Sequence, residues 1–535
     1  IGAQAIWAPT RPRGSRTRGL RGHGSARRVE SERPDMACCG DECLIFVGWR
    51  SSVRKHSRLR EVREGGFGKA QFILDKPGRI QDQYKDGESK LGEGAYGSVS
   101  KGVHKSTGAV RAIKTVAKTK MKHVERFKRE IAIMKTMDHP NVIKLFETFE
   151  DHRNIYLVME VCTGGELLSR IVEASHFNER DAAVVMQQML RALFYLHEQH
   201  VCHRDLKPEN FLFYNGDPIE GNVLKLIDFG LSRKFVDGKP MSTKAGTPYY
   251  VAPEVLTGRY GHLVDMWSAG VIMYVLLCGS PPFSGRSEKE VLASVRRGFL
   301  RFNPRAWDGI SQDAKDLVRS LLTSDTARRL SAREALKHPW IKNRAPRARA
   351  RPLPADLVPK LRGFRSRTRF EKAVLHVIAS QLSEPQIRGL REAFLALDQN
   401  GDGLLALAEL KGGLARAGLR ELPEDLGEIM AGIDADHSGM IDYTEFLAAT
   451  IERRQYIQED VCWTAFRVFD VDGDGRITPS ELEMVLRDGS VSSMVNAQAV
   501  ADVLKEVDKN GDGAIDFEEF MSMMRGMSLD ACDMP

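Results

Sequence analysis

The chain has 535 residues, of which 42% are hydrophobic and 28% charged, and its formal net charge is +7 at pH 7. This composition excludes a fully disordered, collagenous or fibrous chain, and the length predicts about three or four domains. Eight scattered cysteines do not make a disulfide framework, which predicts a reducing, cytoplasmic environment. Because no run of 18 apolar residues is present, we expect no membrane-spanning helix.

Residues 1–83 come before the first patterned segment, and we assign them to a disordered basic extension. Residues 1–35 contain eight arginines among Gly, Ser and Pro and have few apolar residues to bury. Cys38 and Cys39 follow Met36 and would anchor the chain to a membrane if they were acylated. The alternative is that this run has no function, so the sequence leaves membrane attachment open.

Residues 84–341 show the pattern of a small strand-rich lobe followed by a larger helical lobe. Alternating apolar residues predict strands, and longer apolar segments predict helices. A linker rich in Pro and Arg follows over 343–354. The expected strands and helices span 97–103, 109–116, 124–137, 182–198, 263–278 and 288–297.

A glycine-rich turn lies between two apparent strands at the start of this region. A lone GxGxxG pattern is weak evidence, because dinucleotide-binding folds share it; there, however, the glycines open a helix. Here β-type sequence lies on both sides, which favours a flap over the phosphates of ATP. The residues of the turn expected to bind ATP are Leu91, Gly92, Glu93, Gly94, Ala95, Tyr96, Gly97, Ser98 and Val99.

The residues expected to transfer a phosphoryl group follow in chain order. A lysine at the end of a strand can hold the α- and β-phosphates, and a glutamate in the next helix can pair with it. The alternative for that glutamate, Glu130, is an ordinary surface charge. The segment 203–210 then provides a carboxylate for the proton of the substrate hydroxyl, and an amide that reaches a magnesium ion. The expected catalytic residues are Lys114, Glu130, Asp205, Lys207, Asn210 and Asp228, and the last two are the expected magnesium ligands.

This ordered set resembles the signature of protein kinases. The segment 265–270 looks like the buried central helix of that fold, and Glu254 and Arg329 match its C-lobe ion pair. Lys207 and Thr247 resemble the residues found at these positions in the serine/threonine branch of the family. The resemblance implies that the adenine site is completed by Ala112, Met159, Glu160 and Cys162.

The resemblance also implies a choice of substrate. Glu166 and Glu209 match carboxylates that select basic residues N-terminal to the phosphorylated Ser or Thr, which predicts an Arg-x-x-Ser/Thr preference. The alternative for Glu166 is a helix-capping acid. A pseudokinase is the main alternative to an enzyme, but none of the expected catalytic residues is missing.

Residues 342–383 form a basic junction before an acidic C-terminal domain. Residues 342–372 contain 11 basic and 2 acidic residues, whereas residues 384–526 contain 29 acidic and 13 basic ones. Opposite charges in adjacent segments predict an intramolecular partner and not a nucleic acid. The alternative is that two solvated surfaces never meet. A basic amphipathic helix, typical of calmodulin targets, is predicted by the apolar stripe of Leu357, Leu361, Phe364, Phe370, Val374, Val377 and Ile378.

Residues 384–527 contain four similar twelve-residue loops, at spacings of 36, 36 and 38 residues, before a short tail over 528–535. Calcium takes six to eight oxygen ligands, and such loops provide them from positions 1, 3, 5, 7, 9 and 12, with Gly at position 6. We expect weaker binding by the first loop, with Ala406 at position 9, and by the second, with Ser438 at position 5. The expected calcium ligands are Asp398, Asn400, Asp402, Leu404 and Glu409; Asp434, Asp436, Ser438, Met440, Asp442 and Glu445; Asp470, Asp472, Asp474, Arg476, Thr478 and Glu481; and Asp508, Asn510, Asp512, Ala514, Asp516 and Glu519.

The loops resemble the two paired EF-hand lobes of calmodulin. Position 8 is apolar in all four, as the short strand that pairs two loops requires. Four methionines near the C-terminus are expected either in an apolar groove exposed by calcium or in an ordinary core. They are Met521, Met523, Met524 and Met527.

The whole order resembles the calcium-dependent protein kinases of plants and apicomplexan parasites. The fold class implied is a multidomain α+β chain, in which a bilobal kinase precedes an all-α calmodulin-like domain. The resemblance implies a monomer that uses ATP, Mg²⁺ and Ca²⁺, acts on protein substrates, and needs no free calmodulin because its sensor is tethered. It also implies that the junction blocks the active site until calcium binds. A calcium-dependent scaffold with a non-catalytic kinase fold, and a kinase that obeys external calmodulin, are the alternatives.

Overall fold

The computed structural model describes most of the chain from Lys69 onward. It covers residues 69–73, 75–77, 79–94, 97–121, 124–345, 353–354, 356–417, 423–486 and 493–527, which fall within one compact unit. Cys38 and Cys39 lie outside the described residues. No helix in the described ranges combines the length and the apolar character needed to cross a membrane.

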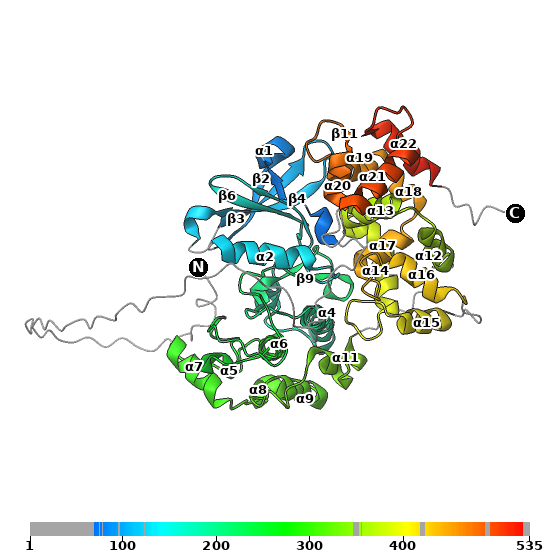
Figure 1. Cartoon of the computed structure of the whole chain (residues 1–535). Helices are drawn as coiled ribbons and strands as arrows, with labels where there is room; N and C mark the ends of the chain where they lie inside the picture. Colours follow the sequence, from blue (N-terminus) through cyan, green and yellow to red (C-terminus); the bar gives the residue numbers. More distant parts are fainter. Residues whose placement is uncertain are drawn as a thin grey trace, which may run out of the picture. The chain divides into compact units, whose positions relative to one another are not determined.

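A six-stranded sheet forms the first lobe of the kinase region (Figure 1). Its order is β1-β5-β6-β4-β3-β2, in which β1 runs parallel to β5 and the other neighbours are antiparallel. Helix α2 (Val124–Thr136) is drawn below the sheet in Figure 1. The strands are β1 (Asp75–Pro77), β2 (Tyr84–Gly94), β3 (Gly97–His104), β4 (Val110–Ala117), β5 (Leu145–Glu150) and β6 (Asn154–Met159).

The second lobe is mainly helical and is built around α6 (Val264–Cys278). Every residue of α6 from Val264 to Leu277 is buried, as expected of a helix that is apolar on all sides. Four short strands accompany the helices: β7 (Val201–Cys202), β8 (Phe211–Phe213), β9 (Leu224–Leu226) and β10 (Arg233–Lys234). The other helices are α3 (Leu167–Ala174), α4 (Glu179–Glu198), α5 (Pro253–Thr257), α7 (Glu288–Arg297), α8 (Pro304–Trp307), α9 (Gln312–Leu321), α10 (Ala332–Leu336) and α11 (Pro339–Arg344).

The observed elements lie close to the expected ones. The helix expected over 288–297 is α7 itself. Helix α4 begins three residues before the expected start at residue 182, because the side chain of Asn178 accepts a hydrogen bond from Asp181 N and so caps it there. Patterns of apolar residues miss this start, since a capped first turn contains polar residues.

The expected ion pair of the second lobe is present. Arg329 Nη1 lies 2.5 Å from Glu254 Oε1, and Nη2 lies 3.0 Å from Oε2. The same guanidinium donates to the carbonyls of Leu263 and Thr323. The Arg329 side chain is fully buried, so the bidentate pair connects α5 to the segment before α10 inside the lobe.

Replacing Arg329 with methionine should therefore destabilise this lobe by about 3 kcal/mol, because the change leaves the Glu254 carboxylate without its buried partner. The measurement is thermal unfolding by calorimetry, in which the transition of the kinase region should move to lower temperature. The matched control is Arg180→Met, since Arg180 is exposed and pairs with the exposed Glu220; its effect should stay within about 0.5 kcal/mol. Equal shifts in the two variants would refute the prediction.

The end of the N-terminal extension is ordered, and this corrects the prediction of disorder up to residue 83. A short 3-10 helix (Lys69–Phe72), β1 and α1 (Ile80–Gln83) lie in this segment. Lys69 Nζ donates to Asp138 Oδ1 at 3.0 Å, and the Phe72 ring packs against Phe469 at 6.4 Å between centroids. Composition could not reveal these contacts, since they depend on single residues far apart in the chain.

The junction consists of two helices and not of one. Helix α12 (Leu357–Arg365) ends before Thr368, which begins α13 (Arg369–Gln381) through a capping box with Glu371. The apolar stripe continues across this break, so periodicity alone predicted a single helix. The expected apolar residues are nevertheless all buried, because both helices pack on the domain that follows.

Two EF-hand pairs follow the junction, and we call this domain (residues 384–527) the sensor. The apolar residues at position 8 pair as expected: Leu405 bridges Ile441, and β11 (Arg476–Ile477) pairs with β12 (Ile515–Asp516). Met521, Met524 and Met527 are buried in the core, and Met523 packs against it. The helices are α14 (Glu384–Leu397), α15 (Leu407–Arg416), α16 (Leu426–Ile433), α17 (Tyr443–Thr450), α18 (Arg453–Tyr456), α19 (Glu459–Phe469), α20 (Pro479–Leu486), α21 (Ser493–Val507) and α22 (Phe517–Gly526).

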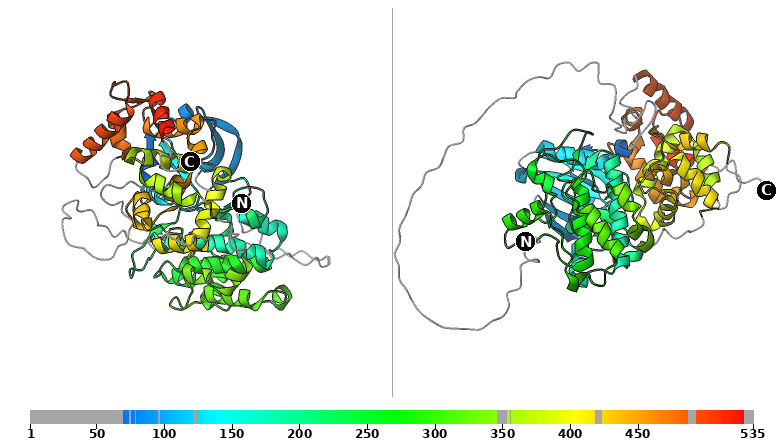
Figure 2. Two further views of the ribbon diagram at one scale, coloured as in Figure 1. Left: turned by 90° about the vertical axis from the view of Figure 1, so that its right-hand side faces the viewer. Right: turned by 90° about the horizontal axis from the view of Figure 1, so that it is seen from below.

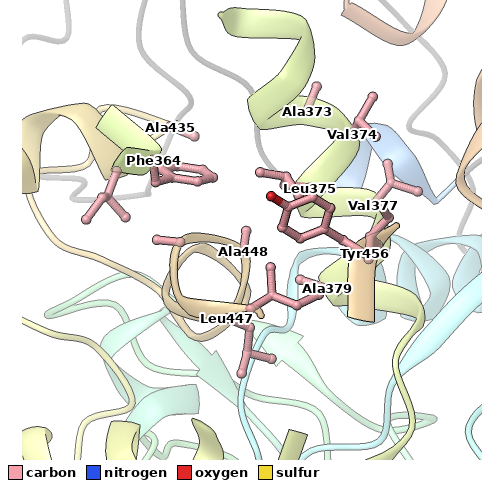
Figure 3. Packing of buried hydrophobic residues seen from close by; sticks show 14 of the residues in the cluster. Phe364, Ala373, Val374, Leu375, Val377, Ala379, Ala435, Leu447, Ala448 and Tyr456 are labelled. Carbon is pink, nitrogen blue, oxygen red and sulfur yellow. The ribbon is translucent and has the colours of Figure 1, made fainter. Parts of the chain in front are cut away.

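The junction and both EF-hand pairs share one apolar core. Helix α12 packs on α16 and α17, whereas α13 packs on α17 and α19, so that α13 touches both pairs. In both views of Figure 2 the yellow-green helices of the junction lie beside the yellow and orange helices of the sensor. In Figure 3 the side chains of Leu375 and Val377 lie among those of Leu447, Ala448 and Tyr456. The sensor therefore holds the junction as a calmodulin-like domain holds a target helix.

Candidate functional site

The catalytic loop places three expected residues around one carboxylate. Lys207 Nζ lies 3.0 Å from Asp205 Oδ2, and Thr247 Oγ1 donates to Asp205 Oδ1 at 2.8 Å. Asn210 Nδ2 donates to the backbone oxygen of Asp205 at 2.7 Å, which leaves the amide oxygen of Asn210 for another ligand. The Asp205 carboxylate is thus held in one orientation by its neighbours.

A buried acid that we did not predict as a site residue positions this loop. Asp265, at the start of α6, is fully buried, and its two carboxylate oxygens accept the backbone N–H groups of His203 and Arg204 at 2.9 and 2.8 Å. Arg204 has φ of 70°, a conformation that costs a non-glycine residue about 1–2 kcal/mol. Asp265 stabilises that strained backbone. The only signal in the sequence is an acid at the start of an otherwise apolar helix.

The residues expected around the ATP phosphates come together between the lobes. Lys114 Nζ lies 3.9 Å from Glu130 Oε1, and Glu130 is buried. Burial disfavours the ionised form of Asp228, but the charge of Lys114 and the N–H of Gly230 outweigh it and lower the pKa of Asp228. The neighbouring Phe229 is buried against the His203 ring. Asp228 therefore remains a carboxylate that can bind a cation.

The glycine-rich turn connects β2 and β3, as expected. Gly94 pairs with Gly97, and Val99 lies opposite Lys114 on β4. A Cβ atom at Gly97 would lie 1.7 Å from the backbone oxygen of Thr115, so only glycine fits there. Of the other expected residues, Leu91 is exposed, Gly92 and Ser98 are half-buried, and Glu93 belongs to β2. Ala95 and Tyr96 lie outside the described residues.

The strand that leads to the hinge brings the expected adenine residues together. Ala112 pairs with Met159 across β4 and β6, and both are buried. Glu160 accepts from Lys144 N at 2.7 Å and pairs with Lys225 Nζ at 3.0 Å. Its carboxylate is thus engaged, and its N–H donates to the Lys144 carbonyl at 3.0 Å, so only its backbone carbonyl remains for adenine. Burial raises the pKa of the Cys162 thiol, so it stays protonated at neutral pH.

Glu166 and Glu209 form an acidic pair beside the catalytic loop. Burial raises the pKa of Glu209, and the charge of Glu166 raises it further. Glu166 forms a backbone bridge with Leu212, three residues after Glu209, so the two acids lie on adjoining segments. Glu209 Oε2 is buried and has no hydrogen-bond partner among the described residues. Glu166 precedes α3 but makes no side-chain capping bond, so the capping alternative is not supported.

All four calcium loops have the same backbone cage. In the third loop, Asp470 at position 1 accepts N–H bonds from Gly473 and Gly475, and Glu481 at position 12 accepts from Val471 and Thr478. Corresponding bonds reach the glutamates of the other loops, Glu409, Glu445 and Glu519. The glycine at position 6 has a positive φ in each loop, which an L-residue rarely adopts. In each loop backbone N–H groups therefore hold the carboxylates of positions 1 and 12 in place.

Two loops bring carboxylates close enough to share an ion. Oxygens of Asp434, Asp436 and Glu445 lie within 4.8 Å of one another, as do those of Asp470, Asp472 and Glu481. Burial and the neighbouring acids raise the pKa of Glu445 well above its usual value. A divalent cation would relieve this cost, so the donor set fits calcium. The backbone carbonyls of the position 7 residues Leu404, Met440, Arg476 and Ala514 stay predicted ligands, and that of Met440 accepts the Ser438 hydroxyl at 3.0 Å.

The first and fourth loops differ from these two. In the first, the Asn400 amide donates to Asp402 Oδ2 at 2.8 Å, and burial raises the pKa of Asp398 to about 7 and that of Asp402 to about 6. In the fourth, Asp512 Oδ2 pairs with Arg476 Nη1 of the third loop at 2.9 Å. In the same loop the expected ligands Asp508, Asn510 and Asp516 accept backbone N–H bonds from Gly511, Asp512 and Glu519.

The predicted meeting of basic and acidic surfaces is confirmed. Arg362 binds Asp425 with two hydrogen bonds, at 3.0 and 2.7 Å, and Arg365 pairs with Glu428. The sensor also contacts the kinase region directly, since Thr444 donates its N–H and its hydroxyl to Asp138 at 2.8 Å each. This contact is buried and joins residues 306 positions apart.

Comparison with known proteins agrees with this geometry. A protein kinase domain family matches residues 85–341, and an EF-hand domain pair family matches residues 387–451 and 459–525. Calcium-dependent protein kinase 3 of Plasmodium berghei is 45% identical over 464 residues, which cover 86% of this chain and 83% of that protein. Calcium-dependent protein kinase 11 of Oryza sativa is 42% identical over 84% of this chain and 77% of that protein. For calcium-dependent protein kinase 17 of Arabidopsis thaliana the identity is 40%, over 85% of each chain. On these matches, the chain belongs to the calcium-dependent protein kinase family.

Proposed function

We propose that this protein transfers the γ-phosphoryl group of ATP to serine or threonine in protein substrates when calcium binds its own EF-hands. The observation that carries the catalytic part is the Asp205 carboxylate, held by Thr247 and Lys207 beside the Lys114–Glu130 pair. Asp205 accepts the proton of the attacking hydroxyl, and Lys114 holds the phosphates. Asn210 and Asp228 would hold Mg²⁺, which supplies positive charge against the phosphates when it is bound.

The acidic pair supports a preference for basic substrates. A buried carboxylate oxygen without a partner is costly, and an arginine side chain of a substrate would satisfy it with a charge-assisted hydrogen bond. Glu166 adds a second negative charge next to it. We therefore propose that an arginine N-terminal to the target residue binds at Glu209 and Glu166.

Replacing Glu209 with glutamine should lower kcat/KM for a peptide with Arg three residues before Ser by about thirtyfold, the equivalent of one lost charge-assisted bond. A peptide with norleucine in place of that arginine should lose little. The matched control is Glu173→Gln, an exposed glutamate at the end of α3, which should leave both peptides unaffected. If Glu209→Gln slows both peptides equally, Glu209 supports the catalytic loop and does not choose the substrate.

The position of the junction supports a calcium switch within one chain. Its two helices are buried in the core of the sensor, with Leu361 and Val374 almost fully enclosed. We propose that this is the active arrangement, and that the junction covers the active site when the loops lose calcium. Inverting a 1:99 equilibrium needs about 5.5 kcal/mol of differential binding, which four sites can share. Because one chain carries both the junction and the sensor, a monomer is sufficient for this switch. We propose the domain limits 84–341 for the kinase, 342–383 for the junction and 384–527 for the sensor.

The test is transfer of phosphate from Mg-ATP to a basic serine peptide, with calcium or with chelator, and without calmodulin. Activity only with calcium is the expected result. Equal activity in both conditions would refute the switch but leave the kinase assignment intact. Absence of activity in both, for a protein that still binds calcium, would favour the scaffold alternative.

A further inference from the structure

The first calcium loop lies directly on the kinase region. A Cβ atom built on Gly403 would lie 2.5 Å from His139 Cδ2 and 3.1 Å from Tyr195 Cδ2. One built on Gly401 would lie 3.4 Å from Arg191 Cγ and 3.6 Å from its Nε. The glycines at the same positions of the third and fourth loops, Gly473, Gly475, Gly511 and Gly513, have no such neighbour within 4 Å. Helix α4 therefore forms one wall of the first loop.

This wall places a positive charge beside the first ligand position. Asp398 is 2% exposed and accepts the N–H of Gly401 at 2.7 Å, and the Arg191 side chain packs against this same glycine. No ion pair of Arg191 is found among the described residues, so its charge is not neutralised at contact distance. Glu198, an exposed residue at the C-terminal end of α4, carries the opposite charge on the same helix. Because Arg191 packs against the loop, whereas the charge of the exposed Glu198 is screened by water, Arg191 has the larger effect on an ion bound there.

The first loop also has the poorest set of ligands. It offers three carboxylates, from Asp398, Asp402 and Glu409, whereas each of the other loops offers four. Position 9 is Ala406, which has no side-chain oxygen. Calcium affinity of such loops depends on the number of charged ligands. A nearby cation thus acts on the loop that is least able to compensate for it.

We propose that Arg191 of the kinase region weakens calcium binding at the first loop, and that its positive charge partly replaces the charge of the ion there. Repulsion between the guanidinium and the ion lowers the affinity of this loop while the sensor is docked. The same charge stabilises the buried Asp398 when no ion is bound, so the loop can remain docked with its cavity empty. The first loop then serves mainly as a docking surface, and the other three report calcium.

This inference rests on calcium binding by the EF-hands, which is part of the proposed function. The test measures calcium binding to the full chain by competition with a chromophoric chelator. The contribution of the first loop is identified as the binding step that disappears in Asp398→Ala. Arg191→Gln should strengthen that step by about tenfold, as the removal of one partly screened charge predicts. Glu198→Gln should weaken it by a smaller factor.

Three controls separate charge from packing and folding. Arg191→Lys keeps the charge and should bind calcium as the unchanged protein does. Arg180→Gln removes an exposed arginine from the same helix and should have no effect. In an Asp398→Ala background, Arg191→Gln should change nothing. Thermal unfolding identifies a variant that fails to fold. If Arg191→Gln is such a variant, the calcium affinities of Arg191→Lys and Glu198→Gln test the inference in its place.

Several outcomes would overturn the inference. Unchanged or weaker binding in folded Arg191→Gln would show that the guanidinium does not oppose the ion, and an equal effect in the Asp398→Ala background would place its action elsewhere. A full chain that binds no calcium at any loop would instead refute the proposed function. The two failures are therefore distinguishable.

Discussion

Replacing Asp205 with asparagine should lower kcat for phosphoryl transfer by about a thousandfold, the usual contribution of a positioned general base. Asparagine has nearly the same shape and can still accept the hydrogen bond from Thr247, which reaches Asp205 Oδ1 at 2.8 Å. It cannot accept the proton of the substrate hydroxyl. The loss should therefore appear in kcat, with little change in the KM for ATP. The measurement is peptide phosphorylation at saturating calcium and Mg-ATP.

The control for this prediction is Asp308→Asn, an exposed aspartate of the same lobe, which should keep full activity. The Asp205→Asn protein should still bind calcium, because its sensor is unchanged. A variant that loses calcium binding as well would have lost its fold, and its low activity would prove nothing about Asp205. Retention of near-normal kcat by a folded variant would contradict the assigned role and strengthen the scaffold alternative.

The second large effect is expected in the sensor. The double change Glu445→Gln and Glu481→Gln should lower calcium-stimulated activity by about a hundredfold, because the active arrangement would no longer be favoured over the inhibited one. These two glutamates belong to the groups in which three carboxylates lie within 4.8 Å. Each normally provides a bidentate ligand, and an amide replaces a charged oxygen by a donor. The measurement is activity against free calcium concentration.

A matched control exists in the second EF-hand pair, at two glutamates that are not ligands. Glu483 and Glu518 lie within two residues of position 12 glutamates, and Glu518 is exposed next to the buried Glu519. Changing both to glutamine removes the same charge from the sensor without removing a ligand, and activity should persist. If control and test variants lose activity equally, the net charge of the sensor, and not ion binding, governs activation.

Much of the chemistry could be predicted because its residues are close in sequence. Asp205, Lys207 and Asn210 lie within six positions, so the local backbone brings them together whatever surrounds them. Each calcium loop closes on itself over twelve residues, and the paired residues at position 8 were correctly predicted to meet. The segregation of charge also predicted a contact between the junction and the sensor, since unlike charges in adjacent segments attract, and the pair of Arg362 with Asp425 is part of that contact.

Single residues that act across long separations were not predictable from pattern. Asp265 supports the catalytic loop from 61 residues away, and Asp138 binds Thr444 across 306 residues. Lys69 and Phe72 give no periodic signal, yet they order the end of a segment that composition alone marked as disordered. Each of these contacts exists only after two elements have packed together.

The sequence by itself thus determined the class of enzyme and the order of the domains, and it predicted the ions, because these depend on residue types at short spacings. The tertiary structure decided the rest: that the junction breaks at Thr368 into two helices, that both are enclosed by the sensor, and that Arg191 faces the first calcium loop. The physical reason is that burial and charge effects depend on distance in space. A helix face or a lone arginine acquires its role only from the surface that packs against it.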